Sequence, residues 1–560
     1  MRNKKKVQIW KISIVILSTL VLLLLVGSYF VSHKLKPLLG KRLEDTIAEY
    51  SKGLYSIKYS DLDLNIAGGN LSLKDVRLVH DSIIYKNLDI SKKAPNTRFQ
   101  GRTNSLRVSG LNLWDILVKK RIQISSIELD SLKCKAILRS RSYNMDKSEK
   151  NLYDRIKNRF KSIALDEFRV NSIDLEFVNL NNEKSNSITV NGANLNVTKF
   201  LLDEQSLKDS MRILYAKDIA IHIPEFTTDL KRAPYKFRIE DFRFSSQDGM
   251  MNIGNLALQP TLNLENFAKQ DKLNKPRIDM KIDSIHITGV NSQKLLLGKI
   301  FEADSMHVKG GLFELAKDKR YQKENVSKIG QSPAQQLLEV GVPISIKGVK
   351  VSHIDLSYAQ ISDKYFREGK IDFKSISGTF QNVSNVGSVL RKNRNMNADL
   401  QGSVYGQGQL KVQFSFDMLS DIGNYSYAGK LSAMKVSGYN RILEPLLNIR
   451  LTEGNLKAIT FDMEGNDTKN WGEFNFEYDH LKVELLKDPG KGRGKKGILS
   501  FIANKFFIND SNPDANGKLH VAQVDYDRNP NHPFFKVVWK SLLQGIIECT
   551  GTDSKYFPGI

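Results

Sequence analysis

An eight-residue pattern recurs about a dozen times along this chain and limits what it can fold into. It reads apolar, any, apolar, polar, small or turn-forming, apolar, any, apolar. Residues two apart on a strand share a face, so each copy predicts two short strand segments with one apolar face. The copies begin at Ile57, Leu71, Leu106, Ile122, Phe168, Phe237, Met251, Met280, Ile344 and Val349, with looser copies at Ile188 and Phe301.

The third and sixth positions of each copy are three residues apart, and this odd spacing would turn the second half of the copy to the opposite face of the strand. A β-bulge restores the phase by inserting one residue, and Gly, Asn or Asp tolerates the backbone angles required. A two-residue hairpin would also restore it but would leave very short arms. We therefore predict bulged strands, with hairpin turns between copies, in a long antiparallel sheet curved into a trough. The fifth positions are mostly small or turn-forming: Asp61, Asp75, Gly110, Ser126, Ser172, Asp241, Asn255, Ser284 and Gly348.

Composition places the 560 residues among folded proteins, with 41% hydrophobic and 26% charged residues. The net charge of +23 leaves anionic head groups or a solvated outer surface as explanations. The lysines are scattered between strands and no nucleic-acid-binding motif is present, so nucleic acid is not an expected partner. Cys134 and Cys549 allow one disulfide and imply no disulfide framework.

Residues 12–32 are predicted to form a transmembrane helix, because they include an uncharged run of 20 residues that can cross a bilayer. Ile12, Leu22 and Val31 mark its start, middle and end. A cleaved signal peptide is the alternative, but its apolar part is usually shorter and ends in small residues. The basic tail 1–11 favours a cytosolic amino terminus.

The rest of the chain divides by composition into four regions. We predict an amino-terminal β-repeat groove over 33–316, a polar boundary at 317–332, a carboxy-terminal β-rich region over 333–530 and an apolar helical tail over 531–560. In the third region, alternation around Leu410, Tyr425 and Trp471 predicts longer antiparallel strands.

Three short helices are expected outside the tail, at residues 37–50, 147–163 and 439–447. We expect the first two to pack over the sheet. For the tail helix at 533–547, two interpretations stay open: a membrane-interface or acceptor contact, and a cap over a sheet edge. The apolar stripe of the 147–163 helix would be Leu152, Ile156, Phe160 and Ile163.

No motif with catalytic chemistry is apparent. The nine histidines form no metal-ligand pair at the usual spacings, and the glycine-rich stretch 490–497 departs from the phosphate-loop pattern. A Gly-x-Ser-x-Gly elbow is missing and no carboxylate pair stands out. We therefore predict no catalytic residue, no metal site and no cofactor.

Several segments resemble the AsmA-like family of bacterial envelope proteins. They are the stretch KPLLGKRLEDTIAEYSKGLYSIKYSDLDLNIAGGNLSLKDVRL after the apolar run, SLRVSGLNLWDILVKKRIQISSIELDSLKCKAIL, and the later GQGQLKVQFSF, WGEFNFEYDHLKVELL and FFKVVWKSLLQGI. The resemblance implies a relative of bridge-like lipid transfer proteins, anchored in the inner membrane with a periplasmic body. It implies phospholipid cargo moving along a hydrophobic β-groove toward the outer membrane.

Two repeat copies are the candidates for the lining of such a groove. The alternative is a scaffold for envelope assembly proteins, whose closed β-body never touches lipid. Ile282→Lys separates the two, because it should unfold a closed core but only block transport in an open trough. A third possibility, a polysaccharide enzyme, would require a cleft with clustered carboxylates. The candidate lining residues are Ile122, Ile124, Ile127, Leu129, Met280, Ile282, Ile285 and Ile287.

Overall fold

The computed structural model describes most of the chain after residue 42. The predicted transmembrane segment 12–32 and the glycine-rich stretch 490–497 lie outside the described residues. Within them, no helix has the length and hydropathy needed to cross a bilayer. The described residues are 43–45, 47–49, 51–65, 68–112, 115–116, 118–144, 152–158, 160–181, 186–206, 208–230, 233–323, 326–486 and 509–551.

The protein is mainly β, as predicted, with 57% strand and 17% helix. The strands of the amino-terminal half are β1 (Tyr55–Lys58), β2 (Asp61–Asn65), β3 (Asn70–His80), β4 (Thr97–Ser109), β5 (Arg121–Leu138), β6 (Ser162–Asn179), β7 (Asn186–Leu202), β8 (Asp218–Leu230), β9 (Tyr235–Ser245) and β10 (Met250–Ile253). Those of the carboxy-terminal half are β11 (Asn255–Pro260), β12 (Arg277–Thr288), β13 (Phe301–Asp318), β14 (Ile344–Ile361), β15 (Glu368–Ser384), β16 (Asn395–Val404), β17 (Gly408–Asp417), β18 (Tyr425–Lys435), β19 (Ile449–Gly465), β20 (Lys469–Leu485) and β21 (Val521–Asp527).

The helices are short apart from the last. They are α3 (Ser82–Ile90), η2 (Ser142–Asn144), α5 (Leu152–Ile156), α6 (Leu264–Gln270), η3 (Lys294–Gly298), η4 (Lys319–Tyr321), α7 (Pro333–Leu338), α8 (Gly387–Leu390), η5 (Val436–Tyr439), α9 (Asn440–Leu447) and α11 (Phe534–Cys549). The predictions at 439–447 and 533–547 are confirmed by α9 and α11. Residues 43–45 and 47–49 are helical, within the range predicted at 37–50.

The chain forms two compact units, residues 1–228 with 238–251, and residues 229–237 with 252–560. The polar stretch 317–332 falls inside the second unit, because β13 continues to Asp318 and the following residues pack within that unit. Lys328 illustrates this packing, since its backbone N–H donates to Pro530 O and its ammonium group to Leu273 O.

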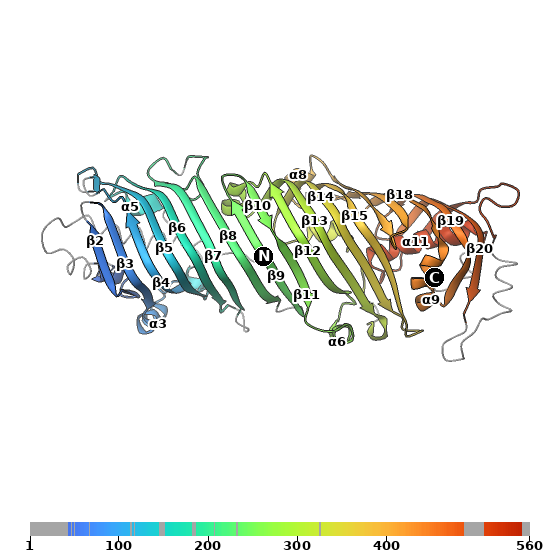
Figure 1. The fold of residues 1–560 in the computed structure, drawn as a ribbon, viewed down its shortest axis with the longest axis horizontal. Helices are drawn as coiled ribbons and strands as arrows, with labels where there is room; N and C mark the ends of the chain where they lie inside the picture. Colours follow the sequence, from blue (N-terminus) through green and yellow to red (C-terminus); the bar gives the residue numbers. More distant parts are fainter. Residues whose placement is uncertain are drawn as a thin grey trace. The chain divides into compact units, whose positions relative to one another are not determined.

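Most neighbouring strands within each unit pair in chain order and antiparallel (Figure 1), whereas β1 and β2 both pair with β3. Two pairs are parallel, β5 with β6 and β13 with β14, so the expectation of a purely antiparallel sheet is wrong at these points. A parallel pair needs a crossover connection. The connections 139–161 and 319–343 serve this purpose, and both carry short helices.

The first crossover corrects the predicted helix at 147–163. Its helical part in the structure, α5, ends at Ile156, and Ile163 already belongs to β6. The stripe was nevertheless informative, because Ile156, Phe160 and Ile163 are all buried in one hydrophobic cluster. Ile156 and Phe160 have a helical spacing, and Ile163 is the first inward-facing residue of the next strand. The sequence pattern therefore predicted one helix that was too long.

Candidate functional site: the apolar face of the sheet

The bulges predicted from the repeat are present at several copies. Within strands, Asp75, Ser172 and Asp241 have left-handed backbone conformations, with φ between 49° and 55°, whereas Gly110, with φ 70°, lies just after the end of β4. In the pairing of β6 with β7, the register shifts on either side of Ile173, directly after Ser172. Because the bulge inserts one residue, both halves of the copy present their apolar side chains on one face.

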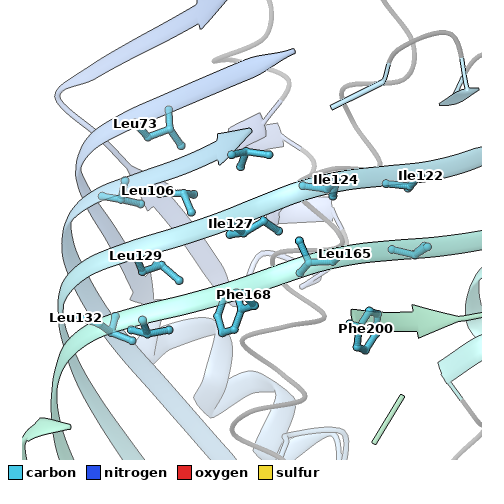
Figure 2. Packing of buried hydrophobic residues seen from close by; sticks show 14 of the residues in the cluster. Leu73, Leu106, Ile122, Ile124, Ile127, Leu129, Leu132, Leu165, Phe168 and Phe200 are labelled. Atoms are coloured by element: carbon cyan, nitrogen blue, oxygen red, sulfur yellow. The ribbon is translucent and has the colours of Figure 1, made fainter. Parts of the chain in front are cut away.

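In the first unit these side chains align across strands into rows. One row contains a single apolar residue from each of six consecutive strands, β3 to β8. Its members are Leu71, Val108, Ile127, Phe168, Val197 and Ile219. Figure 2 shows the labelled residues Ile127 and Phe168 on the same side of their strands.

The structure brings the predicted lining residues Ile122, Ile124, Ile127 and Leu129 together on β5. All four are buried in the first hydrophobic cluster, and Ile127 is only 1% exposed. The same cluster includes residues from outside the strands: Leu43, Ile47, Ile116, Ile156 and Phe160. Here the apolar face is covered by the chain itself.

The second unit, described by itself, also has rows of apolar side chains, and they include bulkier residues. One row runs from β12 to β15 through Met280, Phe313, Leu356 and Phe373. All four are half-buried, so they keep part of their surface accessible. A parallel row crosses eight strands, from β12 to β19. Its members are Ile287, Met306, Val349, Phe380, Ala398, Phe414, Tyr427 and Met463.

The remaining predicted lining residues lie on β12, with Ile282, Ile285 and Ile287 buried and Met280 half-buried. They face the same side as the half-buried residues of β13, because Ile285 pairs with Val308. Seven of the eight predicted residues are therefore buried, and Met280 alone among them keeps part of its surface accessible.

Helix α11, red in Figure 1, covers the apolar face at the carboxy-terminal end. The Phe534 ring lies 4.8 Å from the Tyr425 ring, centroid to centroid, in an edge-on arrangement. Gly545 is in close contact with Phe474, and a Cβ at this position would come within 2.5 Å of the ring. Of the two interpretations of the tail helix, the structure shows intramolecular packing, with Phe535 alone strongly exposed at 67% among its large apolar residues.

Titratable groups do not assemble into a recognisable catalytic site among the residues described. Within these residues, no group of three or more His, Cys, Asp or Glu could hold a metal ion. His222 pairs with Asp241 at 3.0 Å, which is a surface contact between β8 and β9. Cys134 and Cys549 are both free and buried, and burial raises the pKa of the Cys134 thiol to about 11.

A shallow hollow lies on the face opposite the apolar rows, over β15 to β19. Its lining combines polar side chains with Ala398, Phe414 and Ala428, and Asp399 accepts a hydrogen bond from Gln413 Nε2 at 3.3 Å. It is lined mainly by Thr379, Gln381, Asn397, Asp399, Gln413, Ser415, Ser426 and Asp462.

Comparison with known proteins identifies no relative of this chain. No protein-family model matches the sequence, and no curated protein is significantly similar to it. The class of this protein is therefore defined by its fold alone. It is a mainly β protein whose strands align apolar side chains into rows on one face.

Proposed function

We propose that this protein is a membrane-anchored lipid carrier of the bacterial envelope, with the AsmA-like resemblance of its sequence as one support. Residues 12–32 anchor it in the inner membrane, and the β-rich body lies in the periplasm. The apolar face accommodates phospholipid acyl chains on their way to the outer membrane, in contact with envelope assembly proteins. No catalytic step is part of this proposal.

The observation that carries the proposal is the half-buried row on β12 to β15. Folding normally buries large apolar side chains, yet Phe313 and Phe373 retain accessible surface on the apolar face. Exposing two acyl chains of about 16 carbons to water would cost on the order of 25 kcal/mol of free energy. A surface of continuous apolar rows offsets that cost.

A closed scaffold is the second candidate, favoured by the first unit. There the equivalent residues, such as Ile127, are covered by protein and leave no apolar surface for a ligand. The two candidates differ in what touches the apolar face of the second unit in the cell.

Adjacent residues on β13 provide a matched test in the full chain. Phe313 lies in the apolar row, whereas Leu312 lies on the opposite face and is 38% exposed. A photoreactive p-benzoylphenylalanine is placed at position 313 or 312, in cells grown with radiolabelled phosphate. We expect cross-linked, labelled phospholipid at position 313 and little at position 312. Equal labelling at both positions, or none at 313, would contradict the carrier function.

A further inference from the structure

Helix α3 in the first unit presents two strongly exposed isoleucines on one side. Ile83 and Ile90 are each 73% exposed, and among the large apolar residues described only Met211 is more exposed. Lys86 and Asn87 lie between them at helical spacings of three and four, so these side chains share one face of the helix. Both are also exposed. The outer face of α3 therefore combines apolar and cationic side chains.

Two more lysines lie directly beyond the end of the helix. The N–H of Lys92 donates to Asp89 O at 3.1 Å, and that of Lys93 donates to Leu88 O at 2.7 Å, which fixes the turn after α3. Both lysine side chains are exposed, whereas Ala94 is fully buried. We define the α3 surface as Ile83, Lys86, Ile90, Lys92 and Lys93.

The two acidic groups of segment 81–93 are engaged by other partners. Asp81 is the amino-terminal cap of α3, and its carboxylate accepts from two backbone N–H groups of the first turn, at 2.7 and 2.9 Å. Asp89 pairs with Arg141 and accepts from the Tyr143 hydroxyl at 2.8 Å. The three lysines of the α3 surface form no ion pair with any described residue. Because Arg141 balances Asp89, the α3 surface is electropositive.

The opposite side of α3 is packed on the first unit. Tyr85 is buried with Leu54 and Ala94 in a small hydrophobic cluster. The Arg98 guanidinium lies 4.3 Å from the centre of the Tyr85 ring, and the Tyr85 hydroxyl donates to Pro95 O at 3.3 Å. The exposure of the two isoleucines is therefore a property of a helix that is held in place.

The path of the chain brings α3 close to the predicted membrane anchor. Residues 33–42 separate the end of that anchor from Leu43, which is buried in the first hydrophobic cluster. A connection of this length reaches at most about 40 Å, even when fully extended. The next turn ends at Gly53, whose N–H donates to Ala48 O at 2.6 Å, and a Cβ at Gly53 would come within 2.9 Å of Ile84. Helix α3 thus packs on the segment that follows the predicted anchor.

We infer that the α3 surface rests on the anionic lipid surface of the membrane that holds residues 12–32, and so orients the first unit against that membrane. This inference rests on the proposed membrane anchor and goes beyond the proposed carrier function. The isoleucines enter the boundary between head groups and acyl chains, and the lysines are attracted to anionic head groups. A second copy of the α3 surface is a poorer partner, because it would bring like charges together.

The test uses the full chain in nanodiscs of phosphatidylcholine alone, or of equal parts phosphatidylcholine and phosphatidylglycerol. A nitrobenzoxadiazole fluorophore is attached to Asn87→Cys, on the outer face of α3, and nitroxide-labelled lipids quench it on contact. Cys134 and Cys549 are both buried, and the unmodified chain measures any background labelling. We expect strong quenching in discs that contain phosphatidylglycerol and weak quenching in phosphatidylcholine alone.

An apolar variant tests the isoleucines. Ile83→Asn with Ile90→Asn should lower the equilibrium constant for docking by about tenfold for each isoleucine, because their transfer out of water is lost. The matched control is Val118→Asn with Met211→Asn, which also removes two exposed apolar side chains from the first unit. The control should dock as the unmodified chain does. Because all four side chains are exposed, both variants should keep the unmodified urea midpoint.

A charge variant tests the lysines. Lys86→Gln with Lys93→Gln should lower the same equilibrium constant by about fivefold for each lysine in discs that contain phosphatidylglycerol. Its matched control is Lys208→Gln with Lys217→Gln, which removes two exposed lysines elsewhere in the first unit. The control should leave docking unchanged.

Four results would overturn the inference. Equal quenching in both kinds of disc, unaffected by the charge variant, would show that the anchor alone holds α3 near lipid. Equal losses in the variants and their controls would assign docking to overall charge and hydrophobicity. Quenching that gives way to a signal dependent on protein concentration would assign the α3 surface to a second copy. A chain that did not enter the discs would remove the anchor itself. The carrier function is separate from these results, since it is measured by phospholipid cross-linking at position 313.

Discussion

Tyr427 on β18 and Ser541 on α11 share a buried hydrogen bond of 2.8 Å between their hydroxyl groups. Asn470 on β20 donates to both, at 3.0 Å to Tyr427 and 3.2 Å to Ser541. This buried network joins three elements and fixes α11 on the apolar face. The carboxy-terminal end of that face is therefore closed by a specific polar contact as well as by hydrophobic packing.

Replacing Tyr427 with Phe should loosen α11. The change removes one hydroxyl and leaves Asn470 and Ser541 with fewer partners in a buried site, which costs about 1–3 kcal/mol. We expect faster amide hydrogen exchange across Phe534–Cys549 and a lower urea midpoint. Tyr526→Phe is the control, because its half-buried hydroxyl makes only a long contact of 3.4 Å with His532. Equal exchange rates in both variants would argue against a role of the network in holding α11.

A lysine introduced into the apolar face should have different effects in the two units. Ile127→Lys places a charge in a fully covered core and should unfold the first unit, because an unpaired buried charge costs several kcal/mol. Phe313→Lys lies on the half-buried row, where the ammonium group can reach water, so the second unit should stay folded and lose lipid labelling. Circular dichroism and limited proteolysis measure folding in each case. Two folded variants, or two unfolded ones, would contradict the assigned difference in coverage.

The buried ion pair between Asp467 and Arg528 should be a major source of stability in the second unit. Arg528 Nη1 donates to Asp467 at 2.9 Å, and its side chain is 1% exposed. Gln335 also donates to Asp467, at 2.7 Å, which connects the β13–β14 crossover to the β19–β20 turn. Asp467→Ala should therefore cost about 3–5 kcal/mol, because it leaves the guanidinium group buried without its partner.

Urea unfolding of the full chain, followed by amide exchange in β19 and β20, measures this loss. The exposed pair between Lys469 and Asp525 gives the control, for which Asp525→Ala should cost at most about 1 kcal/mol. A similar loss of unfolding free energy for both substitutions would show that the buried pair stabilises the protein no more than the exposed pair does.

The stability of the second unit without ligand should rise between about pH 7 and pH 10. The folded pKa values of Lys536, Lys540 and Lys317 lie below the ordinary value for lysine. Below these folded-state pKa values, the lysines are protonated in both the folded and the unfolded chain. The folded chain is then destabilised by the full cost of burying their charges. As pH rises, the folded state releases protons that the unfolded state retains, so the penalty disappears.

Urea midpoints at pH 6.5, 8 and 9.5 test this dependence. His532 does not titrate in this range, because burial and the neighbouring cations lower its pKa to about 3. Lys536→Gln with Lys540→Gln should flatten the profile. A midpoint that falls with pH in the unmodified chain would contradict the lowered pKa values of Lys536, Lys540 and Lys317.

Local sequence patterns predicted the elements of this fold well. The odd step in each repeat copy required a bulge, and Asp75 and Ser172 have the backbone conformation that a bulge uses. Alternation predicted β17, β18 and β20, and helical spacing predicted α9 and α11. Where two local patterns met, the prediction failed, as at Ile163, which fits a helical stripe but begins a strand.

The candidate site was predicted only in part. The repeat identified the apolar face, but it predicted the same lining role for Ile127 and Met280. In the structure Ile127 is buried and Met280 is half-buried. The spacing of Lys536 and Lys540 was visible in the sequence. The repulsion between Lys536 and Lys317 was not, because more than 200 residues separate them.

The sequence alone thus determined which side chains share a face, since strand alternation and bulges act over only a few residues. The tertiary structure decided strand direction at β5–β6 and β13–β14, and which parts of the face are covered. Coverage depends on contacts between distant residues, such as Tyr427 and Ser541, which are 114 positions apart. Such contacts follow from how each crossover packs within its own unit and how α11 packs on the strands of the second unit, and no local pattern encodes that packing.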